Sequence, residues 1–323
     1  LISYLKQFFS DESNREKIEL FIDKSVNENP WFSETLVRHA MQAIEEQFFS
    51  VQAWEAFYEN HPGQVATSKK VGIVLAGNLP AVGLHDVLMV LASGNAAHLK
   101  LSSQDKALMQ LYVLAMQSYD AAIPVYIIDR FQGMDAVIAT GSDFSGGYFA
   151  HYFSTIPHII RKNRSSLAVL KGNETVADFK GLAQDIFTYY GLGCRNVTQL
   201  LVPHDYNFER LLQSFNAFRY VMNHHKYQNN FDYHLAIYLL NKVPYMSNDC
   251  LLMVENDLPF SAVSVLHYKY YQSEQEVASF IENNDAIQCV VGKAYLPFGQ
   301  AQNPTLDQYA DGVDTMAFLC ANY

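Results

Sequence analysis

The sequence is poor in cysteine, and its cysteines are not grouped. Cys194, Cys250, Cys289 and Cys320 lie far apart, with no CxxC pair among them. Their spacing excludes a structural zinc site and the paired cysteines of a small disulfide-stapled domain. It favours a protein of a reducing compartment whose cysteines are free thiols.

Basic residues are also few. The chain has 22 lysines and arginines against 33 aspartates and glutamates, a formal net charge of −11, and no basic run with interleaved aromatic residues. A surface that follows nucleic-acid phosphates needs the opposite balance, so no nucleic acid is expected as a partner. Cofactor phosphates would have to be held by local backbone amides and one or two lysines. No metal is expected either, because His224, His225 and His234 lack the facial spacing and partner carboxylates of a ligand set.

No uninterrupted apolar stretch is long enough to span a membrane. The most apolar segment, Val71 to Leu99, is broken by Asn78, Pro80, His85, Asp86 and Asn95. No signal peptide is recognised, and because the chain begins at Leu1 we expect at least its initiator methionine to be missing. We therefore expect a soluble, cytoplasmic protein.

What the sequence does contain is a repeated alternation of helix and strand patterns. Of its 323 residues 50% are hydrophobic and 17% are charged, enough for two domains with their own cores. The first sixty residues predict helices, as do 81–92, 103–119, 176–190, 274–282 and the segment after Gly141-Ser142. Strands are predicted at 71–76, 96–101, 125–128, 136–140, 166–170, 197–202, 251–254, 262–266 and 287–291. This alternation predicts an α/β fold with more than one mainly parallel sheet.

Polar residues follow several of these strands, where ligands collect in parallel sheets. In Gly77-Asn78-Leu79-Pro80, Asn78 is either a turn residue or a donor to developing negative charge, and Pro80 stands at a tolerated first helical position. Lys100 is either a surface lysine or a phosphate contact. Thr140-Gly141-Ser142 is either a plain helix cap or an anion cradle.

Cys194 lies in Gly191-Leu192-Gly193-Cys194-Arg195-Asn196, between a predicted helix and a predicted strand. The neighbouring glycines leave the approach to the sulfur free of side chains. A lone cysteine in such a turn is ordinarily a buried structural thiol. The polar strand ends elsewhere in the chain favour a catalytic nucleophile instead.

In their order, these segments resemble the aldehyde dehydrogenase superfamily, and most closely its acyl-CoA reductase branch, the LuxC family of bacterial fatty-acid reductases. The resemblance runs from about Val71 to the C-terminus. It is carried by Gly77-Asn78-Leu79-Pro80, Ser93-Gly94-Asn95, Lys100-Leu101-Ser102-Ser103, Gly191 to Asn196, and Pro297-Phe298-Gly299-Gln300-Ala301-Gln302 with Tyr309 to Asp314. It implies an aldehyde-dehydrogenase-like architecture, with a Rossmann-type cofactor domain and an α/β catalytic domain.

The resemblance also implies roles for single residues. Cys194 matches the nucleophile that takes the acyl group as a thioester, and Asn78 matches the amide that forms the oxyanion hole with the Cys194 backbone N–H. Hydrolytic members carry Glu-Leu-Gly-Gly upstream of the cysteine, where residues 159–164 of this chain contain no carboxylate. Without a base to activate water, the thioester would survive until it is reduced. The implied reaction is reduction of an acyl-CoA, fatty acyl in the branch it resembles, to the aldehyde.

The implied cofactor is NADPH. Lys100 matches the lysine that contacts the adenosine ribose or its 2′-phosphate, in one strand-end motif with Ser102 and Ser103. Gly141 and Ser142 match the turn beneath the cofactor pyrophosphate. NAD-dependent members carry a glutamate three residues after the lysine, where this chain has Ser103. Without that carboxylate a 2′-phosphate is accommodated.

Two other functions stay open at this point: an acyl-phosphate reductase on the same scaffold, and a non-catalytic nucleotide-binding scaffold. The acyl group could come from CoA or from an acyl carrier. We expect N-terminal helices and a nucleotide-binding domain over 1–163, a catalytic domain over 164–305, and a C-terminal segment over 306–323. This last segment would pair with another segment of the chain or, as an oligomerisation strand, with another subunit of a homo-oligomer. The step from Val291 to Pro297 is shorter than the family suggests. The other three cysteines are expected to be inert, in apolar surroundings.

Overall fold

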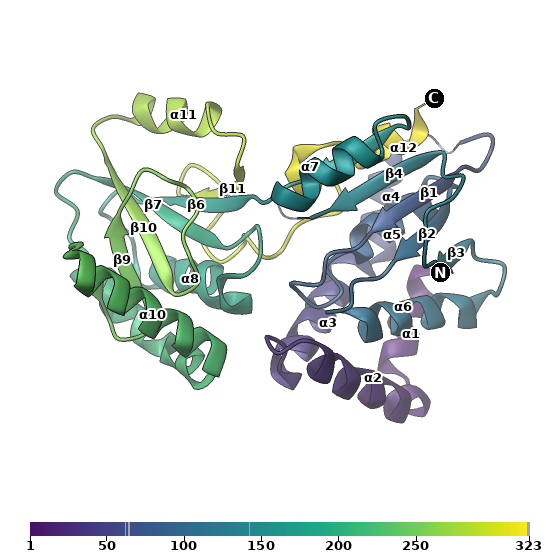
Figure 1. Ribbon diagram of the computed structural model, residues 1–323, viewed down its shortest axis with the longest axis horizontal. Helices are drawn as coiled ribbons and strands as arrows, with labels where there is room; N and C mark the ends of the chain where they lie inside the picture. Colours follow the sequence, from purple (N-terminus) through teal and green to yellow (C-terminus); the bar gives the residue numbers. More distant parts are fainter. Residues whose placement is uncertain (62, 64, 142, 322–323) are drawn as a thin grey trace. The chain divides into compact units, whose positions relative to one another are not determined.

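The computed structural model describes residues 1–61, 63, 65–141 and 143–321 of the chain (Figure 1). Its contacts divide into two compact units. The first comprises Leu1–Asn163 together with Pro304–Tyr323, and the second comprises Arg164–Asn303.

The first unit begins with helices, which confirms the prediction for this part of the sequence. They are α1 (Ile2–Ser10), the 3₁₀ turn η1 (Glu12–Asn14), α2 (Arg15–Glu28), α3 (Glu34–Phe48) and α4 (Val51–Asn60). Serine side chains cap two of them: Ser33 accepts the Leu36 N–H, and Ser50 accepts the Ala53 N–H.

A five-stranded parallel sheet with strand order β3-β2-β1-β4-β5 follows these helices. Its strands are β1 (Lys70–Val74), β2 (Ala96–Lys100), β3 (Val125–Ile127), β4 (Ala136–Thr140) and β5 (His158–Arg161). The connecting helices are α5 (Leu84–Ala92), α6 (Lys106–Tyr119) and α7 (Asp143–Tyr152). β1 lies in the middle of the sheet, with β2 and β3 on one side and β4 and β5 on the other. The carboxyl ends of β1, β2 and β4 therefore surround a topological switch point.

The second unit contains a six-stranded sheet with order β11-β6-β7-β10-β9-β8. It consists of β6 (Ser165–Val169), β7 (Val197–Pro203), β8 (Met246–Ser247), β9 (Leu252–Glu255), β10 (Val265–Tyr271) and β11 (Ile287–Gly292). All neighbours are parallel except β8, which is antiparallel to β9. The two sheets together confirm the predicted α/β fold with more than one mainly parallel sheet.

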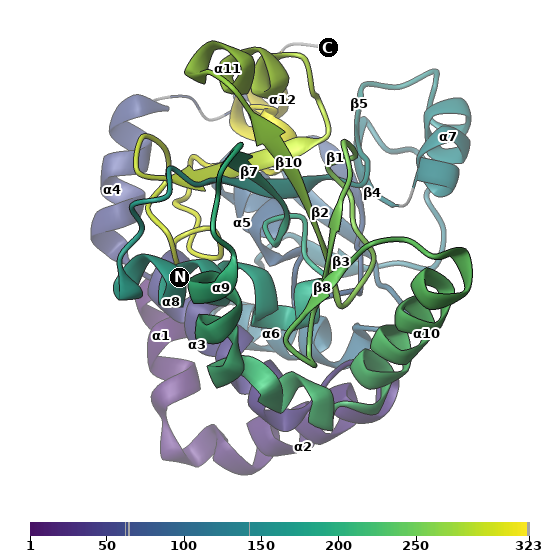
Figure 2. The same ribbon diagram turned by 90° about the vertical axis from the view of Figure 1, so that its left-hand side faces the viewer.

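Helices cover both faces of this second sheet. They are α8 (Val176–Phe187), η2 (Thr188–Gly191), α9 (Glu209–Ser214), η3 (Phe215–Asn223), α10 (His225–Asn241) and α11 (Glu274–Glu282). Figure 1 shows α11 on one face and α8 with α10 on the other. Figure 2 shows α9 leading into α10 along that second face. Coverage of both faces explains why every residue of β6, and every residue of β7 except Pro203, is buried.

The C-terminal segment corrects one prediction. From Leu306 the sequence was expected to form an oligomerisation strand, but the described residues form the 3₁₀ turn η4 (Ala310–Gly312) and the helix α12 (Thr315–Cys320). The Asp314 carboxylate accepts the Ala317 N–H at the helix start, and the buried residues Thr315, Met316 and Leu319 have helical spacing. This helix packs against α5 of the first unit.

A buried ion pair fixes the C-terminal segment within the first unit. The Arg161 guanidinium at the end of β5 bonds the Asp86 carboxylate of α5 at 2.7 and 3.3 Å. It also donates to the Ala310 carbonyl at 2.6 Å and to the Thr315 hydroxyl at 2.9 Å. Arg161 is 3% exposed and Asp86 7%.

None of the described helices has the length and apolar composition needed to cross a membrane.

Candidate active site

Cys194 lies in the second unit, in the turn between η2 and β7, and is half-buried. The turn begins with three residues in the left-handed region: Tyr189 (φ 55°), Tyr190 (φ 56°) and Gly191 (φ 77°). Two consecutive tyrosines in this region carry a conformational cost, and such strain persists only where the surroundings enforce it. The chain therefore leaves α8 through an enforced reversal immediately before the cysteine.

Asn196 holds this turn together. Its carboxamide oxygen accepts the Gly193 N–H at 2.8 Å, and its nitrogen donates to the carbonyls of Asp185, Ile186 and Thr188 at 3.0, 3.2 and 2.8 Å. Its backbone N–H donates to the Gly193 carbonyl at 3.0 Å. One fully buried side chain thus satisfies carbonyls at the end of α8 and fixes the turn that contains Cys194.

Ser166 and Cys289 contact the cysteine turn from the neighbouring strands β6 and β11. The Ser166 hydroxyl lies 3.0 Å from the Cys194 carbonyl and 3.0 Å from the Cys289 thiol, and it accepts the Cys289 N–H at 3.2 Å. Cys289 was expected in apolar surroundings, which is wrong: it is half-buried and faces a hydroxyl and the Arg195 side chain. Burial raises the pKa of its thiol, while Ser166 and Arg195 lower it.

The Pro297-Phe298-Gly299 motif packs directly against α8. A Cβ on Gly181 would lie 2.6 Å from the Phe298 carbonyl oxygen, so the two backbones meet without a side chain between them. The buried Asp185 carboxylate accepts the N–H groups of Gly299 and Ala301 at 2.6 and 3.0 Å. Burial raises the pKa of Asp185 to about 6, against the effect of these two hydrogen bonds.

The short connection that precedes this motif is a tight turn. Gly292, at the end of β11, donates its N–H to the Leu296 carbonyl at 2.9 Å and accepts the Tyr295 N–H at 3.0 Å. The Leu296 N–H donates to the Val290 carbonyl at 3.2 Å. The step from Val291 to Pro297 is therefore closed by backbone hydrogen bonds.

Asn78 lies in the first unit, exposed in the turn after β1. The Asn29 side chain donates to the Gly77 carbonyl at 2.9 Å, and a Cβ on Gly77 would lie 2.4 Å from the Ser102 hydroxyl. Pro80 does not open a helix as expected. Residues 80–83 form a turn in which Ala81 has φ 51°, with its N–H bound to the buried Asp105 carboxylate at 2.7 Å, and α5 begins only at Leu84.

Lys100 lines a pocket of about 600 Å³ at the carboxyl ends of β1 and β2. Its ammonium group donates to the Asp129 carbonyl at 2.8 Å. The segment after β3 and the helix α7 complete the lining. The full set is Val74, Lys100, Asp129, Arg130, Phe131, Gln132, Tyr148, Phe149, Tyr152 and Phe153. Arg130 adds a second cation that the sequence analysis did not single out, and Tyr148 and Tyr152 expose two stacked rings.

The other predicted cofactor residues lie near strand ends of the same unit. Ser102 is half-buried against Gly77, and its hydroxyl accepts the Gln104 N–H at 3.2 Å. Ser103 is exposed. Gly141 follows β4 and donates its N–H to the Arg161 carbonyl at 3.2 Å. Ser142 lies outside the described residues.

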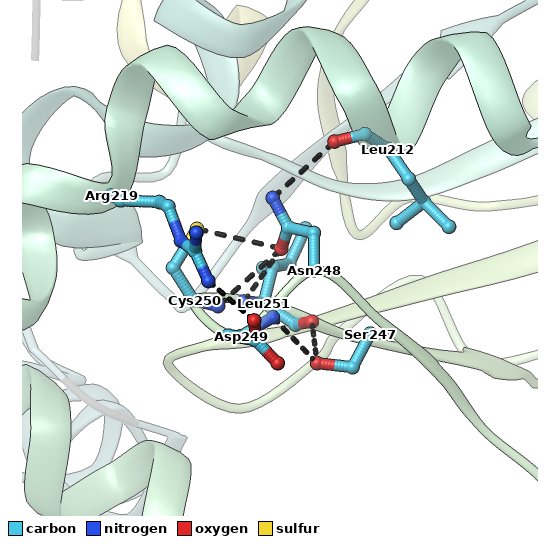
Figure 3. A network of polar contacts seen from close by, with 7 residues as sticks. All are labelled: Leu212, Arg219, Ser247, Asn248, Asp249, Cys250 and Leu251. Carbon is cyan, nitrogen blue, oxygen red and sulfur yellow. Dashed lines mark hydrogen bonds and ion pairs between the residues drawn. The ribbon is translucent and has the colours of Figure 1, made fainter.

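Cys250 has different surroundings, in a separate polar network of the second unit (Figure 3). Its thiol faces the Asn248 carboxamide oxygen at 3.4 Å, and Asn248 donates to the Leu212 carbonyl at 3.4 Å. Arg219 pairs with Asp249 beside it. Cys250 is fully buried, and burial raises its pKa to about 11, so it is protonated at neutral pH.

Among the described residues no histidine, cysteine or carboxylate cluster could hold a metal ion.

No protein-family model matches the sequence, and no curated protein matches it. Solved structures do. A mutant aldehyde dehydrogenase from Bacillus cereus has a TM-score of 0.65 at 14% identity, over 90% of this chain and 70% of that one. The NAD+ complex of the Mycobacterium tuberculosis aldehyde dehydrogenase has a TM-score of 0.63 at 12% identity, over 90% and 71%.

The fold is that of the aldehyde dehydrogenases. At these identities the likeness shows the fold alone. The function of this chain depends on which side chains its own sequence places on that fold.

Proposed function

We propose that the protein is an NADPH-dependent acyl-CoA reductase that forms a thioester on Cys194. One observation carries the proposal: the aldehyde-dehydrogenase-like fold presents a half-buried cysteine in a turn whose backbone is fixed on both sides of the sulfur-bearing residue. Acyl transfer to a thiol needs such a nucleophile, with donors that keep their positions while charge develops.

The residues of the first unit fit a nicotinamide dinucleotide. A pocket of about 600 Å³ is within the range of small-molecule sites, and it lies at the carboxyl ends of parallel strands. Lys100 and Arg130 bring positive charge for phosphate, and Tyr148 and Tyr152 bring aromatic faces for a base. When bound, the cofactor supplies the hydride that converts the acyl group to the oxidation level of an aldehyde.

A phosphorylated ribose is favoured by two features of the first unit. Lys100 and Arg130 line the same pocket, so a 2′-phosphate placed there meets two cations. Ser103 stands three residues after Lys100, where the NAD-dependent members of the superfamily that the chain resembles carry a glutamate, so that carboxylate is missing from this motif. We assign Lys100, Ser102, Ser103, Gly141 and Ser142 to the cofactor on this reasoning and on the resemblance of their motifs.

Cys194 attacks the carbonyl carbon of the acyl-CoA. The new C–S bond forms as the bond to CoA breaks, CoA leaves as a thiolate that takes up a proton, and the acyl group remains on Cys194. After reduction, the bond to the Cys194 sulfur breaks and the aldehyde leaves. The Cys194 N–H donates to the carbonyl oxygen as it becomes negative. The role of second donor is assigned to Asn78 on the resemblance of its motif.

The segment before β6 contains no carboxylate to activate water: Arg161 is engaged by Asp86, and the neighbouring side chains are Lys162, Asn163 and Arg164. A thioester on Cys194 would therefore hydrolyse slowly, since general-base assistance contributes about 10²–10⁴-fold.

Aldehyde formation with NADPH and a panel of acyl-CoA thioesters tests the proposal. Cys194→Ala should abolish aldehyde formation and leave NADPH binding unchanged, and Cys250→Ala should affect neither. Activity with an acyl phosphate but not with acyl-CoA would show that the substrate is an acyl phosphate. Full activity of Cys194→Ala would overturn the mechanism.

Cofactor preference is tested separately. Ser103→Glu should reverse the preference for NADPH over NADH, because a carboxylate repels the 2′-phosphate. Ser118→Glu, which adds the same charge at an exposed position of α6 outside the Lys100 motif, is the matched control. Tighter binding of NADH than of NADPH by the unmodified protein would refute the assignment.

A further inference from the structure

The turn that contains Cys194 is fixed by side chains that the mechanism above does not use. The peptide group before the cysteine is held because the Gly193 carbonyl accepts the Asn196 N–H at 3.0 Å. In a trans peptide the N–H points opposite to the carbonyl, so this bond also sets the direction of the Cys194 N–H. The peptide group after the cysteine is held by a different residue.

That residue is Ser166, the second residue of β6. Its hydroxyl lies 3.0 Å from the Cys194 carbonyl oxygen and accepts the Cys289 N–H at 3.2 Å. The backbone N–H can only donate, so the hydroxyl proton remains for the cysteine carbonyl. The Cys289 thiol, also 3.0 Å from the hydroxyl, can donate to it as well.

Ser166 is rigid for two reasons. It is 1% exposed, and its backbone N–H is bound to the Asn196 carbonyl at 3.0 Å, so its strand is joined to the far end of the same turn. A buried hydroxyl that forms hydrogen bonds to both a strand and a turn holds the turn in a fixed position relative to the sheet.

We propose that Ser166 is a positioning residue for the nucleophile: by holding the Cys194 carbonyl, it fixes the second peptide plane of the cysteine and thereby the position of the thiol and of the Cys194 N–H. This inference rests on the proposed function of Cys194. A misplacement of about 1 Å in a reacting group can cost about 10²-fold in rate. We expect substrate binding to be independent of this contact.

The test compares Ser166→Thr with Ser166→Val, two side chains of the same shape that differ in the hydroxyl. We expect Ser166→Val to lower kcat for aldehyde formation about ten- to a hundredfold relative to Ser166→Thr, with KM for acyl-CoA and NADPH within about threefold.

Ser165→Ala is the matched control. Ser165 precedes Ser166 in β6, is 2% exposed, and its hydroxyl contacts the Pro259 carbonyl at 3.1 Å and the Thr198 hydroxyl. Its loss should destabilise the unit to a similar extent and leave kcat unchanged. Cys289→Ala, which keeps the backbone N–H, should also leave kcat within about threefold.

Amide hydrogen exchange of residues 193–196 gives a readout that does not depend on activity. Exchange in the turn should be faster in Ser166→Val than in Ser166→Thr and unchanged in Ser165→Ala. Equal exchange in the Thr and Val variants would overturn the positioning role even in a protein without reductase activity. Faster exchange with an unchanged kcat would overturn its catalytic importance. Full activity of Cys194→Ala would overturn the proposed function, on which the catalytic role of Ser166 rests, whereas the exchange comparison would still show whether Ser166 fixes the turn.

Discussion

Loss of the Asp86 carboxylate should destabilise the first unit strongly. The Arg161 guanidinium is 3% exposed and cannot lose its proton, so Asp86→Asn takes a carboxylate away from a buried positive charge. The Ala310 carbonyl and the Thr315 hydroxyl, which Arg161 also contacts, are neutral and do not replace that charge. Breaking a buried pair in this way costs about 3–5 kcal/mol. Asp86 also stands in the first turn of α5, where a negative charge contributes about 0.3–1 kcal/mol.

We therefore expect Asp86→Asn to lower the free energy of unfolding by at least about 3 kcal/mol, about a hundredfold in the equilibrium constant. Urea unfolding followed by circular dichroism measures this change. Glu34→Gln is the control, because Glu34 pairs with Arg38 at 2.9 Å on the surface of α3 and an exposed pair contributes less than about 1 kcal/mol. Equal losses in the two variants would refute the reasoning, since burial would then make no difference to the ion pair.

Three further predictions concern the second unit and its cysteine turn. Gly181→Ala should destabilise the protein by about 1–3 kcal/mol, because its Cβ would lie 2.6 Å from the Phe298 carbonyl oxygen, whereas Gly146→Ala, with contacts of 3.6 Å or more, should be neutral or stabilising; thermal unfolding of both variants checks this. The pKa of Asp185 is raised from 3.8 to about 6, so the folded state binds this proton more tightly than the unfolded state does. The resulting contribution to stability is complete below about pH 4 and is lost as pH rises through 6. The unfolding free energy of the wild type relative to Asp185→Asn should therefore fall by about 2–3 kcal/mol between pH 4 and pH 7, and a constant difference would contradict the prediction. Limited alkylation followed by peptide mass analysis should label the half-buried Cys194 before the fully buried Cys250, whose pKa is about 11, and labelling in the reverse order would contradict the assignment of the nucleophile.

Elements with a strong local signal could be predicted from the sequence. The strand at 136–140 and the helix at 274–282 have the predicted bounds, because the strand is a short apolar run and the helix begins at a serine cap, where Ser273 accepts the Glu276 N–H. The start of α5 was misplaced by several residues. The Ala81 N–H is bound by Asp105, far along the chain, and this contact delays the helix.

Elements that depend on distant partners could not be predicted. The strand β5 was missed because it ends in Arg161, a charge that is buried through contacts with distant residues, among them the Asp86 carboxylate. The surroundings of Cys289 depend on the pairing of β11 with β6, which brings it to Ser166, 123 residues earlier in the chain. Arg130 follows β3 without any motif, and only the pocket identifies it.

The first unit is assembled from both ends of the described chain, with the whole of Arg164–Asn303 inserted between them. During synthesis, the strands of this unit's sheet are translated long before residues 304–321 leave the ribosome. Until then the Arg161 guanidinium lacks the Ala310 carbonyl and the Thr315 hydroxyl, and the buried Asn95 amide lacks the Leu319 carbonyl, which it bonds at 3.1 Å. The first unit is therefore translated first and finished last, and a nascent chain arrested before Pro304 should carry an unfinished first unit that is prone to capture by chaperones.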